Sequence, residues 1–386
     1  SWSVFGQVVI LLLIQIGGLG VVTIMSGLMI LLHKKMGIND RLLLQDAFNL
    51  NSLSGLVRFV KKVVIGTLVI EGIGALLYMT VFIPDFGSKG IWISIFTSIS
   101  AFCNAGIDII AENSLCDYAL NPMVNTVTCL LIVIGGIGYI VWWDIIRVIK
   151  NIRQNKRKIF GNLTLHSKIA IISTLLLIIV GAILVFVLEY DNPQTLKDYT
   201  LLQKIEVSFF QSVTTRTAGF TTLPQENLTN ATAVVCLLLM FIGGSPVGTA
   251  GGIKTVTFAV IIASAWASIC NKKDTELFGR RLAKQAVGKA VAVTCMSFAI
   301  MFVSTVLLSA TMDADLLDIA YEAASATATV GLTRNLTTTL NDIGKFIVII
   351  TMYLGRVGPI SLAVAFNRKK ENPNIIRNPI EEISVG

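Results

Sequence analysis

Long stretches of apolar residues recur along the chain, separated by short polar segments. Four runs of about 20 residues or more carry no charged side chain, and a fifth is interrupted only by Glu71; they cover residues 4–32, 120–143, 169–188, 290–312 and 63–83. A helix of ~20 apolar residues is long enough to cross the ~30 Å hydrocarbon core of a bilayer. The pattern therefore predicts an integral membrane protein crossed by several helices.

Three shorter runs lie between these long ones, at 91–102, 205–215 and 317–327. Helices of this length are too short to cross the membrane and suit re-entrant half-helices. Each run ends at a segment containing a glycine. Non-helical backbone at membrane depth is tolerated only where protein buries it or water lines it, so we expect the three segments to converge on one central pathway. Helices lying flat on the membrane surface are the alternative, which suits one copy better than three in register.

The positions of the charged residues predict how the chain is oriented in the membrane. Only 14% of residues are charged, and the net charge is +8. Of the 31 Lys and Arg residues, 23 lie in 33–62, 147–168, 271–289 and beyond 366, next to the long apolar runs. By the positive-inside rule these segments face the cytoplasm, so the basic charge does not indicate nucleic acid. The intervening segments are acidic, and an acidic outer face concentrates cations. For any single acidic residue, an ordinary solvated loop is an equally good interpretation.

Catalytic and metal-binding patterns do not emerge from the sequence. The two histidines, His33 and His166, fall at helix ends, and no serine–histidine or paired-carboxylate arrangement lies at membrane depth. The cysteines show no CxxC or finger-like spacing; they are Cys103, Cys116, Cys129, Cys236, Cys270 and Cys295. We therefore expect no enzyme activity and no bound cofactor.

The chain contains an internal repeat. Segments beginning at Ser100, Val213 and Ser325 read alike, and their glycines, Gly106, Gly219 and Gly331, are separated by 113 and 112 residues. A second glycine series lies in the helices that follow, separated by 118, 108 and 112 residues; its members are Gly17, Gly135, Gly243 and Gly355. Two independent markers keep one period, which is the signature of repeated structural units.

This period predicts an all-α integral membrane fold, with pseudo-fourfold repeats of helix, re-entrant pore loop and helix around a central pore. The repeats divide the chain at 1–57, 58–165, 166–285 and 286–386, the last including a C-terminal tail. The range 1–57 holds only the second helix of the first repeat and a cytoplasmic linker. We expect the missing first helix and its glycine segment to precede Ser1, or else to come from another chain.

The glycine segments have the chemistry of a cation filter. Rings of backbone carbonyls can replace the water around an alkali cation, and glycine permits the φ angles that turn successive carbonyls inward. The half-helices aim their partially negative C-terminal ends at the same place. The candidate filter residues are Cys103, Asn104, Ala105, Gly106, Arg216, Thr217, Ala218, Gly219, Ala328, Thr329, Val330 and Gly331, with K⁺ bound at their carbonyls.

A second unusual segment runs from 243 to 255, where six of thirteen residues are glycine or proline. Such a composition should break a helix inside the membrane. A phosphate-binding loop is excluded, because Ile253 stands where that motif needs glycine. The candidate loop residues are Gly243, Gly244, Ser245, Pro246, Gly248, Thr249, Gly251, Gly252 and Lys254.

Two arginines fall at membrane depth, where a charge is costly and marks a functional candidate. Arg356 stands ten residues into an otherwise uncharged run. Snorkelling, or pairing with a carboxylate such as Glu71, is the alternative. Arg216 adjoins a filter segment, and we expect it to pair with a carboxylate or to cap carbonyls behind the filter.

Together these motifs resemble a known family. Its most specific pieces are Asn104–Ala105–Gly106, the five residues from Arg216 to Phe220, the run from 242 to 255, and the five residues from Gly355 to Pro359. Over the whole chain the sequence is similar to the membrane subunit of Trk/Ktr/HKT potassium transporters, and most similar to the Ktr type.

The resemblance implies potassium uptake, stimulated by sodium, through a multi-pass protein of the bacterial cytoplasmic membrane. It implies that the 243–255 loop obstructs the pore and moves on gating, and that Arg356 projects into the pore below the filter. It also implies a homodimer among membrane lipids and a ring of cytosolic nucleotide-binding regulatory subunits. K⁺, or Na⁺, would be the transported or activating ion.

A sodium-coupled secondary carrier for another monovalent cation is the alternative function. Carriers of this kind often contain inverted repeats and helices broken at the membrane midplane. Here every repeat has its basic flanks on the same side, so the repeats are parallel. Parallel repeats around an axis along the membrane normal favour a pore.

Overall fold

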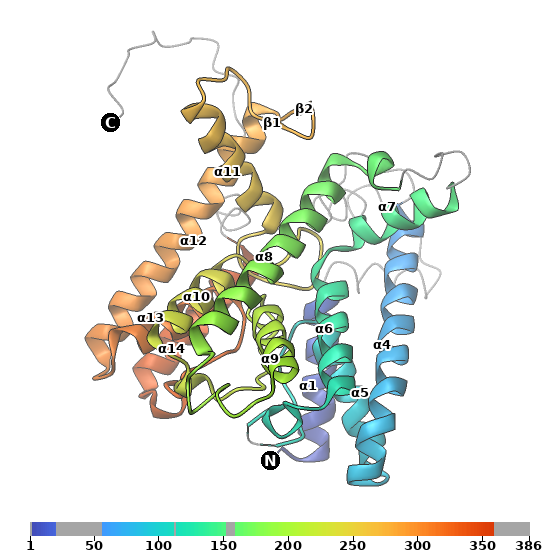
Figure 1. Ribbon diagram of the computed structural model, residues 1–386, viewed down its shortest axis with the longest axis vertical. Coiled ribbons are helices and arrows are strands. Elements are labelled where there is room, and N and C mark those ends of the chain that lie inside the picture. Colours follow the sequence, from blue (N-terminus) through green and yellow to red (C-terminus); the bar gives the residue numbers. More distant parts are fainter. Residues whose placement is uncertain (1, 21–55, 112, 152–158, 359–386) are drawn as a thin grey trace.

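The computed structural model describes residues 2–20, 56–111, 113–151 and 159–358. This part of the chain is helical apart from one small hairpin, as Figure 1 shows, which confirms the predicted helical fold class. The helices are α1 (Val4–Leu19), α4 (Leu56–Phe86), α5 (Lys89–Phe102), α6 (Pro122–Gly136), α7 (Tyr139–Lys150), α8 (Leu165–Glu189), α9 (Leu201–Thr214), α10 (Asn230–Phe241), α11 (Thr255–Ile269), α12 (Lys284–Thr311), α13 (Leu316–Ala328) and α14 (Asp342–Val357).

The long apolar runs form the long helices. Among the described residues, α4, α8 and α12 are long and apolar enough to cross a membrane. Many of their large side chains are exposed, including Leu76, Val187 and Phe302. Such an apolar exterior is expected where lipid, and not water, surrounds a helix. The described part of the run 4–32 is α1, and the rest of that run lies outside the described residues.

One predicted span is broken. The run 120–143 was expected to be one helix, but α6 and α7 meet at a bend of 95°. The reason lies in the glycines at the corner, since Gly138 has a φ of +93° that helical backbone cannot adopt. The amide of Tyr139 then donates to the carbonyl of Val247, at 2.9 Å, which holds the corner to another part of the chain.

The three short runs form the short helices α5, α9 and α13, of 14, 14 and 13 residues. Their faces are buried in spite of many small polar residues; in α5 these are Ser94, Thr97, Ser98 and Ser100. The hydroxyl of Ser98 donates to the carbonyl of Glu71 on α4, and that of Ser212 donates to the carbonyl of Ile178 on α8. Helices α5 and α9 therefore each dock by a serine onto the long helix before it.

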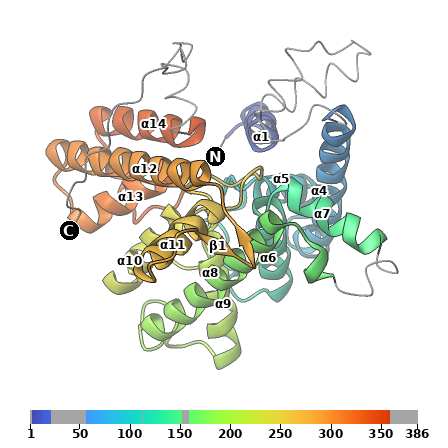
Figure 2. The ribbon, with the colours of Figure 1, turned by 90° about the horizontal axis from the view of Figure 1, so that it is seen from above.

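The helices pack in three groups, which Figure 2 shows from above. In one group α4, α5 and α6 contact one another; in the next α8 contacts α9 and α10; in the last α12, α13 and α14 contact one another. The α1 helix packs on α5, and α9 and α13 reach across to α6 and α10. The short helices therefore lie inward of the long ones.

A small hairpin was not predicted from the sequence. Strands β1 (Glu276–Leu277) and β2 (Arg280–Arg281) pair antiparallel between α11 and α12, at the upper end of Figure 1. Gly279 has a φ of +69°, which makes the tight turn possible.

Candidate functional site: three glycine segments and an intramembrane loop

The three predicted filter segments share one backbone conformation. In each of them the glycine, and the residue two positions before it, have positive φ, a region that residues other than glycine rarely enter. The φ angles are 52° and 65° at Asn104 and Gly106, 68° and 90° at Thr217 and Gly219, and 54° and 95° at Thr329 and Gly331. The structure thus gives the same turn to three segments that are far apart in the sequence.

These segments also lie against one another. A β-carbon added to Gly106 would stand 2.3 Å from the carbonyl oxygen of Ala218, and one added to Gly219 would stand 2.3 Å from that of Val330. Any side chain at either position would collide with the backbone of the next segment. The glycines therefore let the carbonyl-bearing backbone of all three segments meet.

Gly331 is less crowded than the other two segment glycines. A β-carbon there would meet nothing within 4 Å among the described residues. A cavity of about 610 Å³ adjoins this segment. Its walls come from α1, from the segments after α5 and α13, and from α14, which contributes Arg356.

Two glycines of the second series, Gly135 and Gly355, have a physical reason that the sequence did not show. A β-carbon on Gly135 would lie 2.0 Å from the carbonyl oxygen of Phe102, and one on Gly355 would lie 2.1 Å from that of Thr327. Both carbonyls stand four residues before a filter glycine. Helices α6 and α14 therefore press directly on the C-terminal turns of α5 and α13.

The segment 243–255 is a loop, as predicted: α10 ends at Phe241 and α11 begins at Thr255. It contacts all three glycine segments. At the first segment, the hydroxyl of Thr249 donates to the carbonyl of Phe102 at 3.0 Å. At the second, the amide of Gly251 donates to Thr217 Oγ1 at 3.1 Å. A β-carbon on Gly251 would stand 2.4 Å from the carbonyl of Ala328, at the third.

The other loop residues hold the loop in shape. The hydroxyls of Ser245 and Thr255 are hydrogen-bonded at 2.8 Å, and Lys254 Nζ donates to the carbonyl of Ala250 at 2.6 Å. The remaining loop glycines stand where another part of the backbone comes close: Gly243 lies against Gly251, Gly244 against Gly136, Gly248 against Gly135, and Gly252 against Gly243. The carbonyl of Pro246 adjoins Gly138.

Sequence reasoning missed Gly136 and Gly138. The carbonyl of Gly136 accepts the amide of Ser245 at 2.8 Å, and a β-carbon on Gly138 would lie 2.4 Å from the carbonyl of Pro246. A signal was present, because the chain reads Ile-Gly-Gly both at 134–136 and at 242–244, one repeat apart. The corner between α6 and α7 and the loop after α10 therefore meet glycine against glycine.

Both arginines bind carbonyls. Arg216 Nη2 donates to the carbonyl of Gly243 at 2.7 Å. Of the two roles expected for Arg216, this bond corresponds to the capping of carbonyls and not to pairing with a carboxylate. Arg356 Nη1 donates to the carbonyl of Thr249 at 2.9 Å, and its Nη2 donates to that of Gly17. Among the ion pairs of the described residues, none involves Arg216 or Arg356.

Pairing of Arg356 with Glu71 is therefore wrong. Glu71 lies buried in α4 and instead accepts a hydrogen bond from Gln15 Nε2 at 3.2 Å and a weak one from Cys103 Sγ at 3.8 Å. The carboxyl thus joins α1 to the end of α5 by way of a predicted filter residue, Cys103, whose side chain points away into the protein interior.

A further carboxyl lies just after the first glycine segment. Burial raises the pKa of Asp108 above its ordinary value, although hydrogen bonds from Ser114 and from the amide of Ile110 act in the opposite direction. The amide of Ile110 stands 3.3 Å from Asp108 Oδ1. This acidic residue is therefore easier to protonate than one in open solvent.

Long apolar helices, short buried helices and irregular backbone between them are the features from which the class of protein follows. The chain is a multi-pass helical membrane protein in which short helices and irregular segments meet one another inside the bundle. Residues 1–378 match the TrkH family of cation transport proteins, and the chain belongs to that family. This confirms the family resemblance, and with it membership of a family of membrane transport proteins and not of enzymes.

Relatives and a solved structure agree. The chain is 40% identical over 387 residues to Ktr system potassium uptake protein B of Bacillus subtilis (strain 168), which covers 100% of this chain and 84% of that protein. It is 38% identical over 394 residues to potassium/sodium uptake protein NtpJ of Enterococcus hirae, with the same two coverages. The structure of the potassium transporter TrkH from Vibrio parahaemolyticus superposes with a TM-score of 0.67 at 15% identity, covering 85% of this chain and 68% of that one, which supports the fold.

Proposed function

We propose that this chain carries potassium into the cell across the cytoplasmic membrane, through a channel-like pore whose filter consists of backbone carbonyls. The proposal rests above all on one observation, the mutual contact of Gly106, Gly219 and the carbonyls of Ala218 and Val330. A dehydrated alkali cation needs several carbonyl oxygens at once, and segments that touch one another can supply them.

The ends of the short helices support a cation and not an anion. Helices α5, α9 and α13 each end within a few residues of a glycine segment, at Phe102, Thr214 and Ala328. The C-terminal end of a helix carries partial negative charge, and three such ends at one place favour positive ions.

We propose that the loop of residues 243–255 is the gate. The support for this proposal is that the loop contacts all three glycine segments. Arg356 fastens the loop by its bond to Thr249, and its charge adds a barrier to cations. Conduction then requires this loop to move aside.

The pseudo-fourfold repeat, with boundaries at 57/58, 165/166 and 285/286, remains part of the proposal. We propose that a fourth glycine segment fills the cavity beside Gly331. Met352→Cys, on the wall of this cavity, tests this by its rate of modification with a water-soluble maleimide. The rate should be low in the protein in its membrane, and a rate like that of a cysteine in open solvent would contradict the assignment.

A pore that sodium stimulates and a carrier that couples to sodium are distinguished by measuring the entry of Na⁺ and K⁺ together. The name of the relative NtpJ mentions both potassium and sodium, and we propose that sodium stimulates potassium uptake here. Uptake faster with added Na⁺, but without Na⁺ entering in fixed ratio, supports a stimulated pore. Entry of both ions in fixed ratio would indicate the sodium-coupled carrier, whose broken helices the corner at Gly138 and the loop resemble.

We further propose a homodimer and a cytosolic ring of nucleotide-binding regulatory subunits. The support is a basic hairpin end, with Arg280 and Arg281 both exposed. Light scattering of the purified protein tests the dimer. Loss of copurifying regulatory subunit from an Arg280→Glu, Arg281→Glu variant tests the docking face, and full retention would assign it elsewhere.

The central experiment is potassium uptake in cells that lack their own potassium uptake systems, comparing the wild type with Gly219→Ser. The new β-carbon would lie 2.3 Å from the carbonyl of Val330, at a residue with a φ of +90°. We expect at least a tenfold loss of uptake or of preference for K⁺ over Na⁺. Gly288→Ala is the matched control, since nothing lies within 4 Å of the added carbon there. Unchanged uptake by Gly219→Ser at equal membrane abundance would refute a filter at this glycine.

A further inference from the structure

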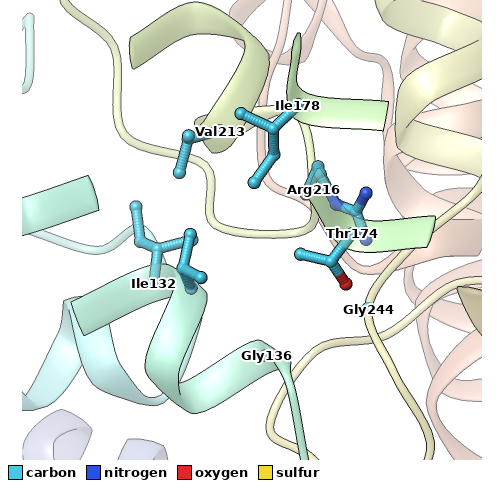
Figure 3. A pocket seen from close by; sticks show the side chains of 8 residues that line it. Ile132, Gly136, Thr174, Ile178, Val213, Arg216 and Gly244 are labelled. Atoms are coloured by element: carbon cyan, nitrogen blue, oxygen red, sulfur yellow. The ribbon is translucent and has the colours of Figure 1, made fainter. Parts of the chain in front are cut away.

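A small cavity lies behind the second glycine segment, between the first two helix groups. Its volume is about 20 Å³, enough for one small ion or a water molecule. Figure 3 shows the side chains around it. They come from α6, α8, α9 and the two irregular segments that follow α9 and α10, and are Ile132, Val133, Gly136, Thr174, Ile178, Val213, Arg216 and Gly244.

Among the described residues, Arg216 is the only charged one that lines this cavity. Its side chain is 5% exposed. Nη2 donates to the carbonyl of Gly243, but Nη1 is buried and has no hydrogen-bond partner among the described residues. A guanidinium buried in this way costs free energy unless an acceptor and a counter-charge are close by.

A second donor faces the same space. Thr174 Oγ1 on α8 is also buried without a partner among the residues that the structure describes. In Figure 3 the side chains of Thr174 and Arg216 lie close together beside Gly244. The carbonyls of the two lining glycines are already in use, since that of Gly136 accepts the amide of Ser245 and that of Gly244 accepts the amide of Thr255.

No carboxylate in the part of the chain that the structure describes forms an ion pair with Arg216. The ion pairs in the described ranges join Arg147 to Asp144, Arg281 to Asp274, Arg334 to Asp318 and Lys345 to Asp342. The cavity therefore combines an unpaired cation, a free hydroxyl and otherwise apolar walls. This combination selects a small acceptor that is negatively charged.

We propose that this cavity binds one small monovalent anion, with chloride as the cellular ion, between Arg216 Nη1 and the hydroxyl of Thr174. A water molecule could accept both hydrogen bonds but would leave the charge of the guanidinium uncompensated. Arg216 stands three residues before Gly219, so a bound anion would also reduce the repulsion between this arginine and a cation at the glycine segments. Binding of the anion does not depend on whether the segments conduct potassium.

Bromide is the probe for the site, because it replaces chloride and scatters X-rays anomalously. Crystals of the purified protein grown in potassium bromide should show an anomalous peak between Arg216 and Thr174. The thermal unfolding midpoint should also rise by about 2 °C for each tenfold increase in chloride, at constant K⁺ with gluconate as the balancing anion. No anomalous peak, with density for a water only, would overturn the proposal.

Thr174→Val removes one ligand of the anion and keeps the volume of the side chain. We expect this variant to need at least tenfold more chloride than the wild type for the same rise of the unfolding midpoint. Thr67→Val is the matched control. Thr67 and Thr174 each stand seven residues before a glycine, Gly74 or Gly181, at which an added β-carbon would meet a half-helix serine hydroxyl at 2.5 or 2.4 Å. Thr67 does not line the cavity, so its variant should keep the wild-type chloride dependence, and equal loss in both variants would refute the site.

Discussion

Arg356 on α14 donates a hydrogen bond from Nη1 to the carbonyl of Thr249, 107 residues earlier in the chain, at 2.9 Å. Its second terminal nitrogen donates to the carbonyl of Gly17 on α1. One side chain thus fastens the loop to two helices from opposite ends of the sequence. A planar guanidinium carries donors on two separate terminal nitrogens in a rigid fork, whereas lysine has a single ammonium nitrogen, so lysine does not reproduce this geometry.

Arg356→Gln should release the loop and raise potassium flux in the absence of any stimulus. A hydrogen bond from a charged donor contributes about 1.5–3 kcal/mol, so its loss should increase the population of the displaced loop roughly tenfold or more. Flux of K⁺ into proteoliposomes measures this.

Arg356→Lys is the control for that substitution, since it keeps the charge but not the bridge. Flux close to the wild-type value in the lysine variant would assign the barrier to charge, and flux as high as in the glutamine variant would assign it to the bridge. Wild-type flux in both variants would mean that Arg356 does not restrain the loop.

Gly135→Ala and Gly355→Ala should each destabilise the protein. The added carbons would stand 2.0 and 2.1 Å from carbonyl oxygens of half-helix ends, and backbone cannot give way as a flexible side chain can. Overpacking of this kind costs about 1–3 kcal/mol, which thermal unfolding in detergent would register as a lower midpoint. Gly72→Ala, which meets nothing within 4 Å, is the control. If all three variants unfold together, the close contacts are not structural determinants.

The stability of the segment around Asp108, after α5, should depend on pH. Burial raises the pKa of this carboxyl above its ordinary value of about 3.8, so the folded state binds the proton more tightly than the unfolded state. The stabilising effect of protonation is therefore complete below about pH 3.8 and is lost as the pH rises through the higher folded pKa. Asp108→Asn should flatten this part of the curve of unfolding midpoint against pH. A curve that coincides with that of the wild type would contradict this role.

The period of the glycines predicted more of the site than the apolar pattern did. It identified the three segments at Gly106, Gly219 and Gly331, and composition identified the broken helix at 243–255. The two expectations agree with the structure because each rests on backbone geometry that few residues besides glycine allow.

Contacts between repeats could not be predicted in the same way. Apolar composition alone made 120–143 look like one span, because the corner at Gly138 is stabilised by the distant carbonyl of Val247, which accepts the amide of Tyr139. The partners of Arg356 were missed for the same reason. A carbonyl is present at every residue, so no sequence pattern marks the one that an arginine will find.

The shortness of α5 and α9 bears on how the protein is made. A helix of 14 residues spans about 21 Å, less than the ~30 Å core, so its own length cannot hold it in a bilayer. Each is bound by a serine hydroxyl to a carbonyl of the long helix that precedes it in the chain, Ser98 to Glu71 or Ser212 to Ile178. For α5, the carbonyl of Phe102 meets Gly135 only after α6 has been synthesised. The contact of α5 with α4 can therefore form during synthesis, before its contact with α6 exists.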